Sequence, residues 1–169
     1  MRKLSIALLA TLLCSAHGSS IAQVKTVSLK EMVGSWNGTG WGKSHAAASR
    51  ETLRCRLTSK YLPRTRELRM QGKCAAAARN FKISGFLKSV GRNKVTGRWT
   101  NPNGVGAINI SGSRGGNAIT FQVKAKDPKT KKTRKYRMVW TLARGSMSVS
   151  TKLADHETKP VGLIRFAKK

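Results

Sequence analysis

The stretch AITFQVKAK, residues 118–126, alternates strictly between apolar and polar side chains. Its apolar phase consists of Ile119, Phe121, Val123 and Ala125, and its polar phase consists of Thr120, Gln122, Lys124 and Lys126. A period of two puts successive side chains on opposite faces of a β-strand. One face of this strand is therefore predicted to be buried and the other hydrated.

The same period recurs along most of the chain, with turn-forming residues between the repeats. We predict further strands at 53–58, 68–71, 136–142 and 147–150, and weaker ones at 33–42, 80–90, 94–100, 105–112 and 161–167. The connections are of hairpin length, and such short connections join antiparallel neighbours. The sequence therefore predicts an all-β fold, a single antiparallel meander of about eight to ten strands. Closure into a complete or nearly complete barrel would remove its exposed edges.

The start of the chain has a different composition. Arg2 and Lys3 precede an apolar run at 4–13, and Ser20 and Ala22 supply small residues where a signal peptidase reads them. The run is much shorter than the roughly 20 residues of a membrane-spanning helix. We predict a signal peptide at 1–22 and a single β-barrel domain at 23–169, located in a periplasm or secreted.

Two cysteines remain after removal of the predicted signal peptide, Cys55 and Cys74. In an oxidising compartment an even pair of cysteines predicts a disulfide. Their spacing matches neither a redox motif nor a zinc site.

A short motif near each end of the chain suggests a relationship. Gly34, Ser35 and Trp36 form the pattern G-x-W on the first predicted strand, and Arg165 lies on the last. These residues resemble the tryptophan and the arginine that pack together in lipocalins and, more loosely, in avidins. The rest of the chain is similar to small exported β-barrel proteins of unknown function from alphaproteobacteria. The resemblance implies a calycin-like barrel in which Arg165 packs over Trp36, a cation-π pair worth about 0.5 to 2 kcal/mol.

Catalytic and metal-binding chemistry is sparse. The predicted mature chain keeps His45 and His156, and its six acids are scattered. The cluster Asp155, His156 and Glu157 falls in a turn, where a charged turn explains it better than a metal site does. We expect neither an enzyme nor a cofactor or metal ion.

Positive charge dominates the composition. The chain has 34 Lys and Arg against 6 Asp and Glu, a formal charge of +28, and loss of Arg2 and Lys3 with the signal peptide would leave +26. Many cations fall on the outward phase of predicted strands: Arg54, Arg56, Arg69, Lys73, Lys82, Lys88, Lys94, Arg98, Lys124, Lys126, Lys135 and Arg137. The sheet exterior is therefore predicted to be basic across several strands.

The segment 126–137, KDPKTKKTRKYR, adds a basic hairpin to this exterior. We predict a polyanion-binding site made of Lys126, Lys129, Lys131, Lys132, Arg134, Lys135 and Arg137 together with Arg54, Arg56 and Arg69. An alternative interpretation of the segment is a hydrated loop tip whose lysines protect a strand edge.

An exported protein meets lipopolysaccharide, acidic polysaccharide and sulfated glycans before it meets nucleic acid, and it can contact membrane surfaces. Nucleic acid fits less well, because few aromatic residues accompany the basic ones. Two other functions remain open. The barrel could carry a small ligand in a pocket lined by Trp36, Trp99, Trp140 and Phe121, or it could be a structural protein of the envelope.

Overall fold

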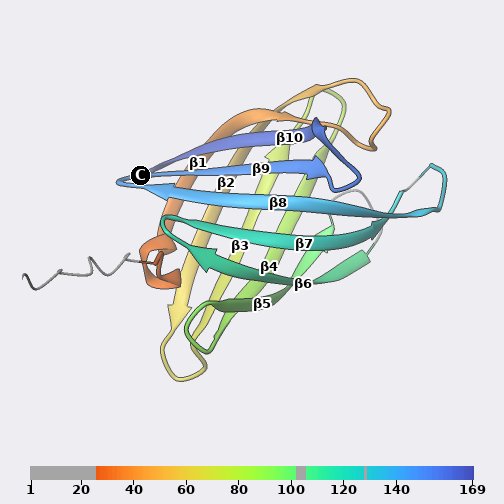
Figure 1. The fold of residues 1–169 in the computed structure, drawn as a ribbon. Helices are drawn as coiled ribbons and strands as arrows, with labels where there is room; N and C mark the ends of the chain where they lie inside the picture. The colour runs from red at the N-terminus through yellow and green to blue at the C-terminus, as the bar shows by residue number, and fades with distance from the viewer. Residues whose placement is uncertain (1–25, 102–105, 128) are drawn as a thin grey trace, which may run out of the picture.

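The computed structural model describes residues 26–101, 106–127 and 129–169, and it leaves the side chains of residues 101, 106 and 156–158 undescribed. Ten antiparallel strands form a closed barrel in which β1 pairs with both β2 and β10 (Figure 1). The strands are β1 (Gly34–Gly42), β2 (Glu51–Leu62), β3 (Glu67–Ala75), β4 (Asn80–Val90), β5 (Lys94–Asn101), β6 (Gly106–Gly115), β7 (Ala118–Lys126), β8 (Thr133–Ala143), β9 (Ser146–Leu153) and β10 (His156–Lys168). The prediction of an all-β antiparallel meander closed into a barrel is confirmed.

The barrel interior is filled from the apolar phase of the strands. On β7, Ile119, Phe121 and Val123 are buried, whereas Gln122 and Lys124 are exposed. Because neighbouring strands are in register, buried residues of one strand lie opposite those of the next, as Ile119 lies opposite Trp140. The period of two therefore separates a dry interior from a hydrated exterior around the ring.

One end of the barrel is covered by a short 3-10 helix, η1 (Leu29–Met32), which was not predicted. Ser28 and Glu31 form a reciprocal capping box at its start. This S-x-x-E pattern was visible in the sequence as a helix-start signal. Val27, Leu29 and Met32 are buried against the barrel and close this end.

Trp36 fastens η1 to the first strand. Its indole Nε1 donates to the Met32 carbonyl at 3.1 Å, and the Ser59 hydroxyl donates to the same carbonyl. Trp36 is 3% exposed. The G-x-W motif thus serves to seal the end of the barrel that η1 covers.

Glycines allow neighbouring backbones to approach closely on the inward phase. A Cβ added at Gly97 would overlap the carbonyl oxygen of Phe86, and one at Gly72 would overlap that of Arg56. Such close approaches are found where a sheet bends sharply into a barrel.

The predicted disulfide is present. Cys55 and Cys74 are directly paired residues of β2 and β3, and their sulfur atoms are 2.02 Å apart.

The predicted signal peptide at 1–22 lies outside the described residues. Within the described chain, no helix has the length and apolar character needed to cross a bilayer.

Candidate anion-binding surface

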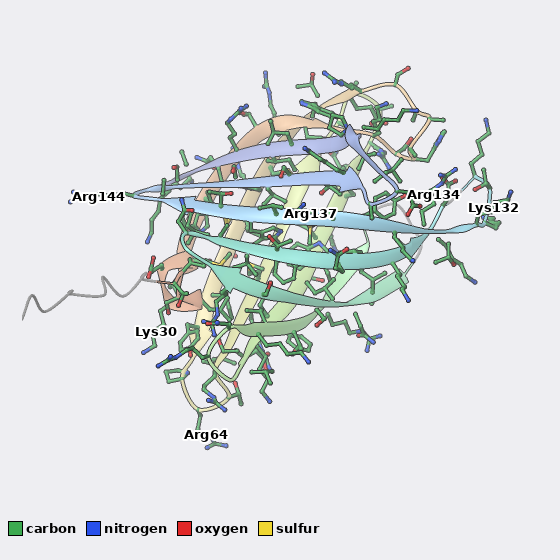
Figure 2. All side chains as sticks on the ribbon, viewed as in Figure 1. Lys30, Arg64, Lys132, Arg134, Arg137 and Arg144 are labelled. Carbon is green, nitrogen blue, oxygen red and sulfur yellow. A yellow bond between two sulfur atoms is a disulfide. The ribbon has the colours of Figure 1, made fainter. Side chains whose placement is uncertain are left out.

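Exposed lysines and arginines lie on the outward phase of eight of the ten strands, and among the described residues β1 and β6 carry none. Every strand cation predicted to face outward is exposed: Arg54, Arg56, Arg69, Lys73, Lys82, Lys88, Lys94, Arg98, Lys124, Lys126, Lys135 and Arg137. Figure 2 shows nitrogen-tipped side chains around the barrel, with Arg64 on the β2–β3 turn, Arg144 on the β8–β9 turn and Lys132 on the β7–β8 loop.

Acidic side chains compensate little of this charge. The described ion pairs join Arg69 to Glu67 at 2.8 Å, Arg79 to Glu51 at 3.4 Å and Arg134 to Asp127 at 3.6 Å. The whole chain has 6 acids for 34 basic residues. Most of the positive charge therefore has no acid with which to pair.

The residues predicted to form one polyanion site lie on two opposite faces. Arg54, Arg56 and Arg69 belong to β2 and β3, whereas the basic hairpin belongs to β7 and β8. Five steps separate β2 from β7 in either direction around the ring of ten strands. A single ligand segment cannot touch both groups, so the predicted site divides into two surfaces.

The β7–β8 loop is ordered by Asp127. Its carboxylate accepts from the backbone N–H of Lys129 at 3.0 Å and of Thr130 at 2.9 Å, and it lies near the half-buried Arg134. The hydrogen bond from Thr130, followed by that from Lys129, holds the pKa of Asp127 below its ordinary value against the opposing effect of burial. Arg134 is thus engaged within the loop, while Lys129, Lys131 and Lys132 are exposed.

The opposite face carries a depression of about 780 Å³ on the outside of β1–β4. We call this the outer groove; its exposed polar lining consists of Asn37, Thr39, Arg54, Arg56, Lys73, Asn80 and Lys82. Among the described residues that line it there is no Asp or Glu.

Like charges face each other across the outer groove. Arg56 is paired directly with Lys73, and Lys73 is paired with Lys82. Neighbouring strands lie about 4.8 Å apart, and like charges in directly opposite positions are destabilising. Lys73 and Lys82 were predicted to face outward but were not included in the predicted site, because strand period alone does not show which residues meet across strands.

A smaller cavity of about 210 Å³ lies inside the barrel at the end opposite η1. Trp99 and Trp140 line it, with Lys43 and Arg79 also in its wall. The indole rings of Trp99 and Trp140 pack edge to face with centroids 5.6 Å apart. Trp140 is 2% exposed, and its Nε1 has no hydrogen-bond acceptor in the described part of the chain.

Two residues predicted for this pocket lie elsewhere. Trp36 packs under η1 at the other end of the barrel, and Phe121 lies behind Trp140, with ring centroids 5.7 Å apart and no part in the cavity wall. Both positions are on the inward phase, but that phase does not say which layer of the barrel a residue fills.

The cation over Trp36 is also a different residue from the one implied by the lipocalin resemblance. Lys168 Nζ lies 5.6 Å from the indole centroid, and Lys168 is the cross-strand partner of Trp36. Arg165 is exposed and pairs with Thr39. Arg165 is on the outward phase of β10, and Trp36 is on the inward phase of β1, so the two side chains are on opposite sides of the sheet.

Trp41 lies on the outward phase of β1 but is only half-exposed. The guanidinium of Arg50 covers its ring at 4.1 Å from the centroid.

The described residues contain no group of three His, Cys, Asp or Glu side chains placed to hold a metal ion, and the side chains of His156 and Glu157 are outside the description.

No family model matches the chain, and a search of curated proteins finds no match.

Proposed function

We propose that the protein is an exported, non-enzymatic, calycin-like barrel that binds anionic polymers of the cell envelope or the extracellular space. The observation that carries the proposal is the exposure of every outward strand cation with so few acids to offset them. A compact domain with such a surplus of charge suffers self-repulsion, which a bound polyanion relieves. Lipopolysaccharide phosphates, acidic polysaccharide and sulfated glycans are the partners that such a surface fits.

The Cys55–Cys74 disulfide supports a location in an oxidising compartment, either periplasmic or extracellular. Polymers of that compartment are rich in phosphate, sulfate and carboxylate groups. The proposed location and the proposed ligand are therefore consistent with each other.

Retention on immobilised heparin tests this function. Each anionic group that is neutralised releases counterions, so binding should weaken steeply as salt rises. We expect the protein to stay bound at about 0.2 M NaCl, where exposed charges more than about 8 Å apart are largely screened. Elution below that concentration, or equal retention on uncharged agarose, would contradict polymer binding.

The interior cavity favours a second candidate, a carrier of a small apolar anion. Its wall combines Trp99 and Trp140 with Lys43 and Arg79, and the Trp140 N–H is a buried donor that an acceptor on the ligand would satisfy. The volume of about 210 Å³ is below the usual range for drug-sized ligands, so the ligand should be no larger than a small aromatic or short-chain carboxylate.

Benzoate is a suitable probe for this cavity, with tryptophan fluorescence as the measurement. We expect saturable binding that Trp140→Phe weakens about fivefold to tenfold, the value of one hydrogen bond. Trp99→Phe is the matched control, because Trp99 also lines the cavity. Absence of binding to the unaltered protein would remove the carrier function, and equal losses in both variants would show that Trp140 acts by packing alone.

A further inference from the structure

We propose that the outer groove is the place where the polymer lies, and that its ligand is one extended chain of an acidic polysaccharide. This inference rests on the proposed function and adds to it a location and a ligand class. It replaces the β7–β8 hairpin, the more conspicuous basic segment of the sequence, as the main binding site.

Uncompensated positive charge is concentrated on the concave surface of the outer groove. Arg56, Lys73 and Lys82 form one continuous row across β2, β3 and β4, and Arg54 lies one outward position further along β2. None of the described residues that line the outer groove is an acid. By contrast, the hairpin carries its own counterion, since Asp127 lies within 3.6 Å of Arg134.

The concave surface continues beyond this row. An adjoining depression of about 570 Å³ shares Arg56, Lys73 and Lys82 with the groove, and a third of about 680 Å³ follows it. The second depression adds Thr58, Gln71 and Ser84. The third adds Lys60, Arg69 and Phe86, together with Glu67, which pairs with Arg69 at 2.8 Å, so the uncompensated charge is concentrated in the first two depressions. A depression of this extent suits a chain better than a single small anion.

Charged and uncharged polar side chains alternate in rows along the strands of this surface. Thr58, Gln71 and Ser84 are mutually paired and form an uncharged polar row beside the row of Arg56, Lys73 and Lys82. A second row lies four residues along β2, β3 and β4 from the first and contains three cations, Lys60, Arg69 and Arg98, with Phe86 between the two arginines. Arg69 is itself paired with Glu67 at 2.8 Å, so this row is partly compensated. At about 3.3 Å per residue, the two cationic rows are roughly 13 Å apart.

This order of side chains fits a polysaccharide. Anionic groups can meet the two cationic rows, while the hydroxyl groups of the sugar between them meet the hydroxyl and amide groups of Thr58, Gln71 and Ser84. Single-stranded nucleic acid would instead stack its bases on several aromatic side chains. Among the described residues that line these depressions, Phe86 is the one aromatic side chain on the outward phase, whereas Phe81 and Trp36 are on the inward phase.

Two variants with the same loss of charge test the location. The groove variant is Arg54→Gln, Arg56→Gln, Lys73→Gln and Lys82→Gln. The control is Lys124→Gln, Lys126→Gln, Lys135→Gln and Lys152→Gln, all exposed residues on the opposite face. Thermal melting of both variants verifies that they are folded.

Binding of a fluorescent heparin decasaccharide, measured as a function of salt, is the readout. We expect the groove variant to bind at least tenfold more weakly and its plot of log K against log salt to be less steep by about 3. The control should lose less than threefold. Equal losses would overturn the groove as the site but leave the proposed function standing, whereas no binding by the unaltered protein would remove the proposed function itself.

A third variant, Gln71→Ala with Ser84→Ala, tests the ligand class without changing charge. We expect it to weaken decasaccharide binding about threefold to tenfold. The slope of log K against log salt should be unchanged, and binding of an oligothymidylate of about 20 nucleotides should not be affected. If the oligothymidylate binds as tightly as the decasaccharide and the variant affects neither, the site recognises charge alone and the polysaccharide assignment is wrong.

Discussion

Among the described residues, Asp127 is the one charged side chain that is fully buried, at 2% exposure. It closes the turn of a strongly cationic loop by accepting two backbone N–H groups. Lys131, which follows in the same loop, has a positive φ of 60° and donates its N–H to the Asp127 carbonyl. A single carboxylate therefore gives a defined shape to a loop whose own lysines repel one another.

The pH dependence of this loop follows from the lowered pKa of Asp127. Because the folded pKa is below the unfolded value of about 3.9, the stabilisation is complete above that value and is lost as pH falls through the folded pKa. We expect the amide resonances of Lys129 and Thr130 to move together in an NMR titration, with a midpoint below about 3.9.

Asp127→Asn is the matched variant for this titration. Asn keeps the shape and one acceptor oxygen but does not ionise in this range. The two amide resonances of the variant should be insensitive to pH between about 2 and 6, a range that includes the ordinary Asp value. A midpoint above the ordinary value in the unaltered protein would contradict the assigned role.

Glycines determine how the strands can pack into a barrel of this curvature. Gly40, Gly72 and Gly97 all face inward, at positions where a neighbouring backbone occupies the space of a Cβ. Any larger residue there would push two strands apart and disturb the hydrogen bonds between them.

Gly97→Ala should therefore destabilise the protein by about 1–3 kcal/mol, the usual cost of inserting an atom into a packed interior. Urea unfolding followed by circular dichroism measures this loss. Gly115→Ala is the control, because a Cβ at Gly115 would meet nothing within 4 Å; it should change the free energy of unfolding by less than about 0.5 kcal/mol. Equal effects of the two substitutions would show that close backbone approach at Gly97 is not important.

Closure of the barrel and the distribution of charge are linked. A closed ring has no edge strands, so every strand presents one side to water, and among the described residues the outward lysines and arginines are distributed over eight of the ten strands. This arrangement limits the repulsion by spreading it, except where the register brings cations together. The row of Arg56, Lys73 and Lys82 is such an exception, and it coincides with a depression.

The amino-acid pattern was sufficient to predict the strands, the inward or outward direction of their side chains, the disulfide and the exposure of the strand cations. The predicted strand at 80–90 coincides with β4, and that at 118–126 coincides with β7. These features depend on neighbours in the chain or, for Cys55 and Cys74, on there being no other partner in the predicted mature chain. Local periodicity is therefore enough to predict them.

The candidate site could not be predicted in the same way. Lys73 is between Arg56 and Lys82 because three strands pair in one particular register, and the hairpin is opposite β2 because ten strands close the ring. Likewise Lys168, and not Arg165, lies over Trp36 because the register of β10 against β1 selects it. Pairing between distant segments depends on the packing of the entire interior, whereas an alternating pattern specifies only the face on which each side chain lies.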